Sequence, residues 1–178
     1  NQLPGHMPVA DDEGRTHVGA IWNAGVPAGY GLSAPEMVHD IASRKIRALY
    51  VIGENPVVSE PQSNFVKWML QRLDLLIVQD IFPTETMQYA HVVFPAAAVG
   101  EKDGTYTNAA RRIQYSAAGL QPPGEARADW FIVQEMAGAM GHTWNYGSAE
   151  DIWEEIRQVA PGFNGVSHAR LKDSAGIF

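Results

Sequence analysis

The stretch Ala48-Leu49-Tyr50-Val51-Ile52-Gly53-Glu54-Asn55-Pro56 decides the fold class. Its apolar run ends in a glycine turn, as is typical of a strand buried in a parallel sheet. Two further runs have the same form: Leu75-Leu76-Ile77-Val78, which ends in Gln79-Asp80, and His91-Val92-Val93-Phe94, which ends in Pro95. Because helical patterns separate the runs, the sequence predicts an α/β fold, a Rossmann-like parallel sheet with helices on both faces in three layers.

Helix start signals lie between these runs. Ser33, with Glu36 three residues later, forms a capping box for a helix that we expect to end near Lys45. Ser59 is expected to cap the next helix, with Pro61 and Gln62 in its first turn. The remaining helices are predicted at 84–89, at 130–140 and, after Ser148, at 150–159.

The other segments predict less regular structure. Residues 1–15 are rich in Pro, Gly and Asp and indicate an irregular arm, which a short strand at Val18–Trp22 and a loop follow. Short strands are predicted at 105–107 and 112–115, with Asp103-Gly104 as a tight turn. We expect one domain, in which residues 1–32 form an N-terminal arm and loop and residues 33–178 form the Rossmann-like part. Both ends have the character of cuts within a longer protein.

Composition and charge exclude several functions. The net charge is -7, whereas binding to nucleic acid phosphates needs a surplus of Lys and Arg. No run approaches the roughly 18 apolar residues of a membrane helix. The chain has no Cys, its six His residues lack zinc spacing, and no Ser/His/Asp set is apparent. We therefore expect no catalytic residue, no metal ligand, no nucleic acid partner and no membrane insertion.

The carboxyl ends of the predicted strands are the expected ligand site, since ligands of parallel sheets bind there. The segments concerned are 53–59, 79–82 and 95–99. The turn Gly53-Glu54-Asn55-Pro56 allows close approach of backbone amides to a ligand, and the helix after Ser59 offers free N–H groups to a phosphate. The alternative is that Asn55 is a turn residue and Ser59 a helix cap.

Three polar residues near these ends have two interpretations each. Gln79 and Asp80 end a buried strand, where one can bind ribose hydroxyls, or they cap the segment that follows. Asp129 stands in the first turn of a predicted helix, where the helix dipole alone favours a carboxylate. A carboxylate can also accept paired hydrogen bonds from the N1–H and the exocyclic amine of guanine.

The motifs together resemble the molybdopterin oxidoreductase family. The resemblance rests on 48–56, on Val78-Gln79-Asp80-Ile81-Phe82, on Val92-Val93-x-Pro95-Ala96, on Glu101-Lys102-Asp103-Gly104-Thr105-Tyr106-Thr107-Asn108 and on Pro122-Pro123-Gly124-Glu125-Ala126-Arg127-x-Asp129-Trp130. Within the family, the sequence is most similar to the catalytic (alpha) subunit of molybdenum- or tungsten-dependent formate dehydrogenase, which oxidises formate to CO2 with transfer of two electrons. The chain would be roughly a fifth to a quarter of such a subunit.

The resemblance implies a cofactor and its contacts. The cofactor is a bis-molybdopterin guanine dinucleotide with Mo or W in the full-length protein, and the fragment is expected to hold none when isolated. The resemblance implies cofactor contacts from Asn55 and Ser59, from Gln79 with Asp80 beside it, and from the backbone of Ala96. It also implies that Asp129 recognises guanine. The iron–sulfur cysteines and the metal ligand would lie outside this chain, which would be inactive alone.

Partners and location follow from the same resemblance. It implies contacts with other domains of the same subunit, electron-transfer subunits, and a cytoplasmic location, with the periplasm as alternative. His91 departs from the family pattern, which usually has Asp there, and we expect it to affect a surface turn or a domain contact. Two other hypotheses stay open: a cofactor-free scaffold, as in the large iron–sulfur subunit of respiratory complex I, and another molybdoenzyme such as assimilatory nitrate reductase.

Overall fold

The computed structural model describes residues 2–177, which divide into two compact units. The sheet unit comprises residues 32–101 and 120–136, and the composite unit comprises the remaining described residues. One boundary between the units lies between Gly31 and Leu32. The composite unit also contains residues 102–119 and 137–177.

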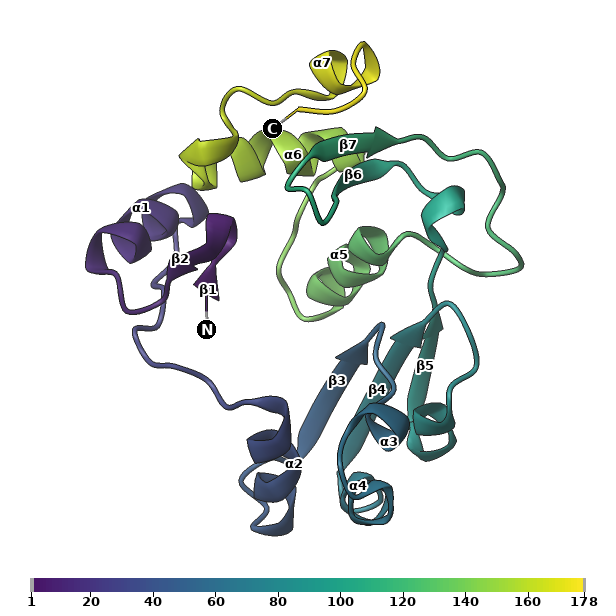
Figure 1. Cartoon of the computed structure of the whole chain (residues 1–178). Coiled ribbons are helices and arrows are strands. Elements are labelled where there is room, and N and C mark those ends of the chain that lie inside the picture. The colour runs from purple at the N-terminus through teal and green to yellow at the C-terminus, as the bar shows by residue number, and fades with distance from the viewer. Residues whose placement is uncertain (1, 178) are drawn as a thin grey trace. The chain divides into compact units, whose positions relative to one another are not determined.

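The sheet unit is built on three parallel strands in the order β3-β4-β5. They are β3 (Ala48–Ile52), β4 (Leu75–Asp80) and β5 (Val92–Pro95), and their arrows point the same way in Figure 1. The register aligns Val51 with Val78 and Val78 with Val93. The α/β class with a parallel sheet is therefore confirmed, because each apolar run became a strand.

Helices pack on the side of the sheet that carries Val51, Leu76 and Val78. They are α2 (Ala34–Ala42), α3 (Pro56–Ser59) and α4 (Ser63–Leu70), with a 3-10 turn η2 (Glu85–Tyr89) where a short helix was predicted. The buried core on this side is Val38, Ile41, Val51, Val57, Val66, Met69, Leu70, Leu73, Leu76 and Val78. The other side of the sheet carries Tyr50 and Gln79, which the first turn of α5 (Asp129–Ala139) reaches through Asp129.

The helix starts of the sheet unit follow the sequence in one case and depart from it in another. The capping box is present: the backbone N–H of Ser33 donates to Oε2 of Glu36 at 2.7 Å. Ser59, in contrast, caps no helix but is the last residue of α3, and α4 begins later, at Ser63. Pro56 has the fixed φ that suits the first position of a helix, so helix formation starts earlier than predicted.

The composite unit begins with elements that the sequence did not predict. Strands β1 (Gln2–Leu3) and β2 (Met7–Pro8) pair antiparallel around the 3-10 turn η1 (Pro4–His6). Helix α1 (Asp12–Trp22) occupies both the expected arm and the expected strand. The missed signal is a helix cap: Oδ1 of Asp11 accepts from the backbone N–H of Glu13 at 3.2 Å.

A two-stranded antiparallel sheet belongs to the composite unit and confirms the two short strands predicted there. It consists of β6 (Gly104–Thr107) and β7 (Ile113–Ser116). The predicted turn at Asp103-Gly104 is wrong, because Gly104 lies inside β6. The turn lies at Asn108, whose Oδ1 accepts from the backbone N–H groups of Ala110 and Arg112.

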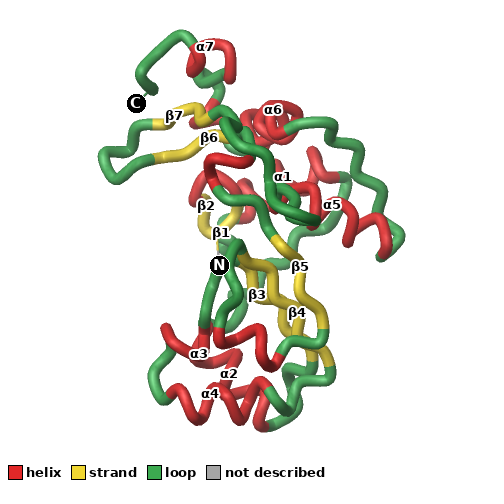
Figure 2. Tube along the Cα trace, turned by 90° about the vertical axis from the view of Figure 1, so that its right-hand side faces the viewer, coloured by secondary structure: helices red, strands yellow, loops and turns green. Residues whose placement is uncertain are grey.

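The last part of the composite unit is helical. It contains α6 (Ala149–Val159), the 3-10 turn η4 (Pro161–Phe163) and α7 (His168–Lys172), and Figure 2 shows α6 and α7 as separate helices. The predicted cap of α6 is confirmed, since Oγ of Ser148 accepts from the backbone N–H of Asp151 at 3.2 Å. Among residues 2–177, no helix is both long and apolar enough to cross a membrane.

Candidate ligand site at the strand ends

Backbone hydrogen bonds join the carboxyl ends of the three strands. The N–H of Gly53 donates to the carbonyl of Gln79 at 2.9 Å, and the N–H of Ala96 donates to the carbonyl of Asp80 at 3.0 Å. Arg127 pairs with the same edge: its N–H donates to the carbonyl of Pro95 at 3.2 Å. Because Arg127 lies two residues before Asp129, this pairing brings the start of α5 to the strand ends.

A buried amide links the sheet to Asp129. The side chain of Gln79 is fully buried, and its Oε1 accepts from the Tyr50 hydroxyl while its Nε2 donates to Oδ1 of Asp129 at 2.7 Å. Burial, and after it the charge of Asp129, raises the pKa of the Tyr50 hydroxyl. Tyr50 therefore stays a donor, which orients the amide so that its N–H groups face the carboxylate.

The loop after β3 is held by Asn55. Its Nδ2 donates to Oε2 of Glu85 at 2.6 Å, and its Oδ1 accepts from the hydroxyl of Thr86 at 2.7 Å. The hydrogen bond from Asn55 is the largest cause that lowers the pKa of the Glu85 carboxyl. Asn55 thus connects this loop to η2.

The other expected contacts occupy different positions along the same edge. Gly53 has φ of +62°, and no heavy atom lies within 4 Å of where a Cβ would stand, so the backbone is open on that side. Glu54 is exposed, and Pro56 begins α3. Oδ1 of Asp80 accepts from the N–H groups of the two residues that follow, at 2.7 and 3.2 Å, and so holds the bend after β4.

The structure brings some of the expected residues together and separates one. Gln79 and Asp129 are in contact, and Gly53 and Ala96 are linked through the strand ends. Ser59 is exposed at the C-terminal end of α3, and the helix that was expected to begin directly after it begins at Ser63 instead. The sequence did not identify Tyr50, Glu85 or Thr86, although alternation along β3 places Tyr50 on the same side as Gln79.

His91 lies at the edge of the sheet where the strands begin, opposite the candidate site. Its exposed ring accepts, through Nδ1, a hydrogen bond from the backbone N–H of Leu76 at 2.9 Å, which is near the start of β4. His91 is therefore a surface residue that fixes the beginning of a strand. Among residues 2–177, no group of three or more His, Asp or Glu side chains is placed to hold a metal ion.

A match to a family model shows to which protein family this chain belongs. Residues 14–139 match the model described as molybdopterin oxidoreductase. The chain belongs to this family. The matched range includes the whole sheet unit together with the start of α5, so the candidate site lies inside the part that the family shares.

Individual relatives agree with the family. The chain is 44% identical over 174 residues to the F420-dependent formate dehydrogenase subunit alpha of Methanocaldococcus jannaschii, with 97% of this chain and 25% of that protein covered. It is 37% identical over 186 residues to the assimilatory nitrate reductase catalytic subunit of Bacillus subtilis, with 99% and 26% covered. The chain therefore spans about a quarter of the length of these relatives.

A solved structure supports the fold. Acetylene hydratase from Pelobacter acetylenicus matches 94% of this chain and 24% of its own, with a TM-score of 0.64 and 17% identity. At this identity the likeness concerns the arrangement of the backbone.

Proposed function

We propose that the sheet unit binds the guanine nucleotide part of a pterin cofactor at the carboxyl ends of β3, β4 and β5. The observation that carries the proposal is the contact between Gln79 and Asp129, which holds a carboxylate beside three parallel strand ends. Ligands of parallel sheets bind at this edge. The membership of the chain in a family named for molybdopterin supports a pterin cofactor as the source of this nucleotide.

The carboxylate of Asp129 fits guanine better than adenine. Guanine presents two adjacent donors, N1–H and the exocyclic amine, and a carboxylate accepts such a pair as a bidentate contact. Adenine presents an acceptor at N1, which a carboxylate repels. Gln79, which donates to Oδ1 at 2.7 Å, orients this carboxylate.

The first strand end fits the sugar and phosphate part of the same ligand. The open side of Gly53 lets backbone approach a ligand closely, and Asn55 fixes the shape of the loop through Glu85 and Thr86. Further proposed contacts are Glu54 on this loop, Pro56 and Ser59 at the two ends of α3, and Asp80 and the backbone of Ala96 on the other two strand ends. When bound, the cofactor would supply metal-centred redox chemistry, while these residues bind and orient its nucleotide.

The complete protein is proposed to be a formate dehydrogenase-like enzyme with a molybdenum or tungsten pterin cofactor. Several relatives bear the name formate dehydrogenase, among them the archaeal alpha subunit at 44% identity. The assimilatory nitrate reductase at 37% identity keeps nitrate reduction as the second candidate. In either case we expect the chain to act together with other domains of its subunit and with electron-transfer subunits, and to be inactive alone.

Titration with nucleotides tests the binding proposal. Isotope-labelled chain is titrated with GDP and with ADP, and amide shifts are followed by NMR. We expect GDP, with affinity on the order of millimolar, to move the amides of Gly53, Asn55, Gln79 and Asp129 more than ADP does. If neither nucleotide moves these amides in a folded sample, the nucleotide proposal fails and a scaffold role for the sheet unit is supported.

A further inference from the structure

The composite unit contains an aromatic hollow around the carboxylate of Glu155. The hollow has two adjoining parts, of ≈ 160 and ≈ 700 Å³, which share Trp22, Tyr146 and Glu155. Trp22 ends α1, Tyr146 lies in the loop before α6, and Glu155 lies on α6. The smaller part is lined further by Pro4, Ile152, Ile156 and Val159, and the larger part by Ile21, Ala24, His142 and Trp144.

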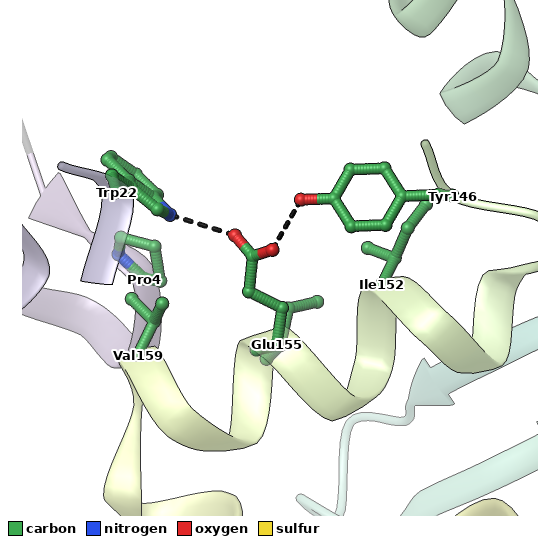
Figure 3. Close-up of a pocket in the computed structure, with 7 residues that line it drawn as sticks. Pro4, Trp22, Tyr146, Ile152, Glu155 and Val159 are labelled. Atoms are coloured by element: carbon green, nitrogen blue, oxygen red, sulfur yellow. Dashed lines mark hydrogen bonds between the residues drawn. The ribbon is translucent and has the colours of Figure 1, made fainter. Parts of the chain in front are cut away.

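Hydrogen bonds from two aromatic side chains hold the Glu155 carboxylate in place. Nε1 of Trp22 donates to Oε1 at 3.1 Å, and the hydroxyl of Tyr146 donates to Oε2 at 2.5 Å. Figure 3 shows the carboxylate pointing away from α6, between the two rings. Burial, and after it the hydrogen bond to Glu155, raises the pKa of Tyr146 to about 12, so the phenol remains a neutral donor.

The carboxylate lacks a cationic partner within the described chain. Within residues 2–177, Glu155 makes its hydrogen bonds only with Trp22 and Tyr146, and it joins no ion pair. The adjacent Glu154, in contrast, pairs with Arg157 at 2.5 Å. Hydrogen bonds from neutral groups orient a negative charge but do not cancel it, so the hollow keeps a negative potential.

Aromatic surface surrounds this charge. The side chains of Trp22 and Trp144 are 46% and 47% exposed, and both line the larger part of the hollow. Indole faces attract cations through their quadrupole, and aromatic side chains that surround a site are the usual receptor for alkylated ammonium groups. The remaining walls are mainly aliphatic, which suits a cation with apolar substituents rather than a hydrated metal ion.

We propose that this hollow binds an organic ammonium ion, with Glu155 as its counter-ion and Trp22, Trp144 and Tyr146 as its walls. The charge of the ligand faces the carboxylate, and its alkyl groups contact the rings and the aliphatic side chains. The residues involved differ from those at the strand ends, so the proposal stands or falls independently of the nucleotide site. The ammonium group can belong to a small molecule or to a lysine side chain.

Two probes of the same shape, one charged and one neutral, test whether the hollow recognises the positive charge. Choline and its neutral isostere 3,3-dimethylbutan-1-ol are titrated into the chain, and the indole N–H signals of the tryptophans are followed by NMR. We expect choline to shift the Trp22 signal with affinity on the order of millimolar, and the isostere to bind at least about tenfold more weakly. Equal binding of both probes would overturn the proposal, because the hollow would then recognise shape alone.

A lysine probe distinguishes the two sources of the ammonium group. N-acetyl-lysine amide is titrated beside its Nε-acetylated form, which has lost the charge. Tighter binding of the lysine probe than of choline assigns the site to a protein side chain, and tighter binding of choline assigns it to a small alkylated ammonium. Failure of both cations to bind contradicts the proposal.

Variants test the role of Glu155 directly. Glu155→Gln removes the charge with little change of shape and is expected to weaken choline binding about tenfold or more. Glu154→Gln is the matched control on the same helix, removes the same charge outside the hollow, and should leave the affinity within about twofold. Trp144→Ala, in an exposed loop position, should weaken binding several-fold without unfolding the chain. Unchanged binding in Glu155→Gln and Trp144→Ala would contradict the proposal.

Discussion

The two units of the chain are assembled in different ways. The sheet unit owes its core to elements that follow one another along the chain, with each strand next to its neighbour in sequence. The composite unit joins segments that are far apart: the ring Nε2 of His17 hydrogen-bonds the carbonyl of Gln158 at 2.9 Å, and Trp22 reaches Glu155. Local sequence patterns therefore account for the core of the sheet unit, whereas distant contacts hold the composite unit together.

The same contrast applies to the two carboxylates that carry the proposals. Asp129 is held by a buried amide beside three strand ends, and Glu155 is held by two ring donors in an aromatic hollow. Backbone and amide surroundings suit a ligand that offers hydrogen-bond donors in a plane, as guanine does. Aromatic surroundings suit a ligand that offers charge and apolar groups. The surroundings of each carboxylate thus indicate which ligand it can bind.

The largest effect is expected from a cavity in the core of the sheet unit. Leu76 is fully buried in the central strand, so Leu76→Ala should lower the free energy of unfolding of this unit by about 2–5 kcal/mol. Urea unfolding followed by amide signals of β3 to β5 measures the loss. Leu75→Ala, one residue earlier and 38% exposed, should cost about 1 kcal/mol or less. Similar losses in both variants would show that the core is not where the structure places it.

A smaller effect is expected from the buried amide. Gln79→Leu removes the acceptor of the Tyr50 hydroxyl and a donor to Asp129, which should cost about 1–3 kcal/mol in the sheet unit. Tyr50→Phe removes only one of these bonds and should cost about 0.5–1.5 kcal/mol. The same urea experiment compares the two. A larger loss in Tyr50→Phe than in Gln79→Leu would contradict the central role of the amide.

The composite unit offers a comparable test on one helix. Ser148→Ala removes the side-chain cap of α6 and should lower the stability of the composite unit by about 1 kcal/mol. Ser148→Asp retains a cap oxygen and is the control, with little expected change. Amide signals of α6 and β7 in urea report the difference. If Ser148→Asp is as damaging as Ser148→Ala, the cap is not the reason for the loss.

The smallest effect is a change with pH. His168 is buried on α7, and this burial lowers its pKa, with the nearby charge of Glu150 acting in the opposite direction. A folded pKa below the unfolded value means that the unfolded chain binds the proton first. The composite unit should therefore lose stability as the pH falls below the ordinary histidine pKa, until the folded pKa is reached.

Urea midpoints at pH 7.0 and pH 5.5, read from amides of the composite unit, measure this loss. His168→Gln should reduce the difference between the two midpoints, and His39→Gln, at an exposed position of the sheet unit, should leave it unchanged. An unchanged difference in His168→Gln would assign the pH dependence to another group.

The sequence predicts the sheet unit well, because its strands and the capping box at Ser33 are local patterns. It fails where two local signals compete: Ser59 precedes a predicted helix, but Pro56 starts helix formation earlier. It also fails at α1, where glycines and acidic residues conceal a helix whose buried residue Val18 packs against Leu3 and Val159. The aromatic hollow of the composite unit could not be predicted, since no spacing in the sequence relates Trp22 to Glu155.

The candidate site was only partly predictable for the same reason. Strand ends are local features, so Gly53, Gln79 and Asp80 could be chosen from the apolar runs alone. The contact between Gln79 and Asp129 joins residues fifty positions apart, and it depends on the pairing of Ala96 with Arg127. No local pattern encodes that pairing.

Guanine recognition by Asp129 is tested by comparing GDP binding of the unaltered chain and of Asp129→Asn, with ADP as reference in both. We expect the unaltered chain to prefer GDP and Asp129→Asn to lose this preference by about tenfold, because an amide presents a donor where guanine needs an acceptor. Amide shifts at Gly53 and Asn55, which reflect the sugar and phosphate, should persist in the variant. If the variant still prefers GDP by the same factor, Asp129 does not read guanine and the proposed site is wrong.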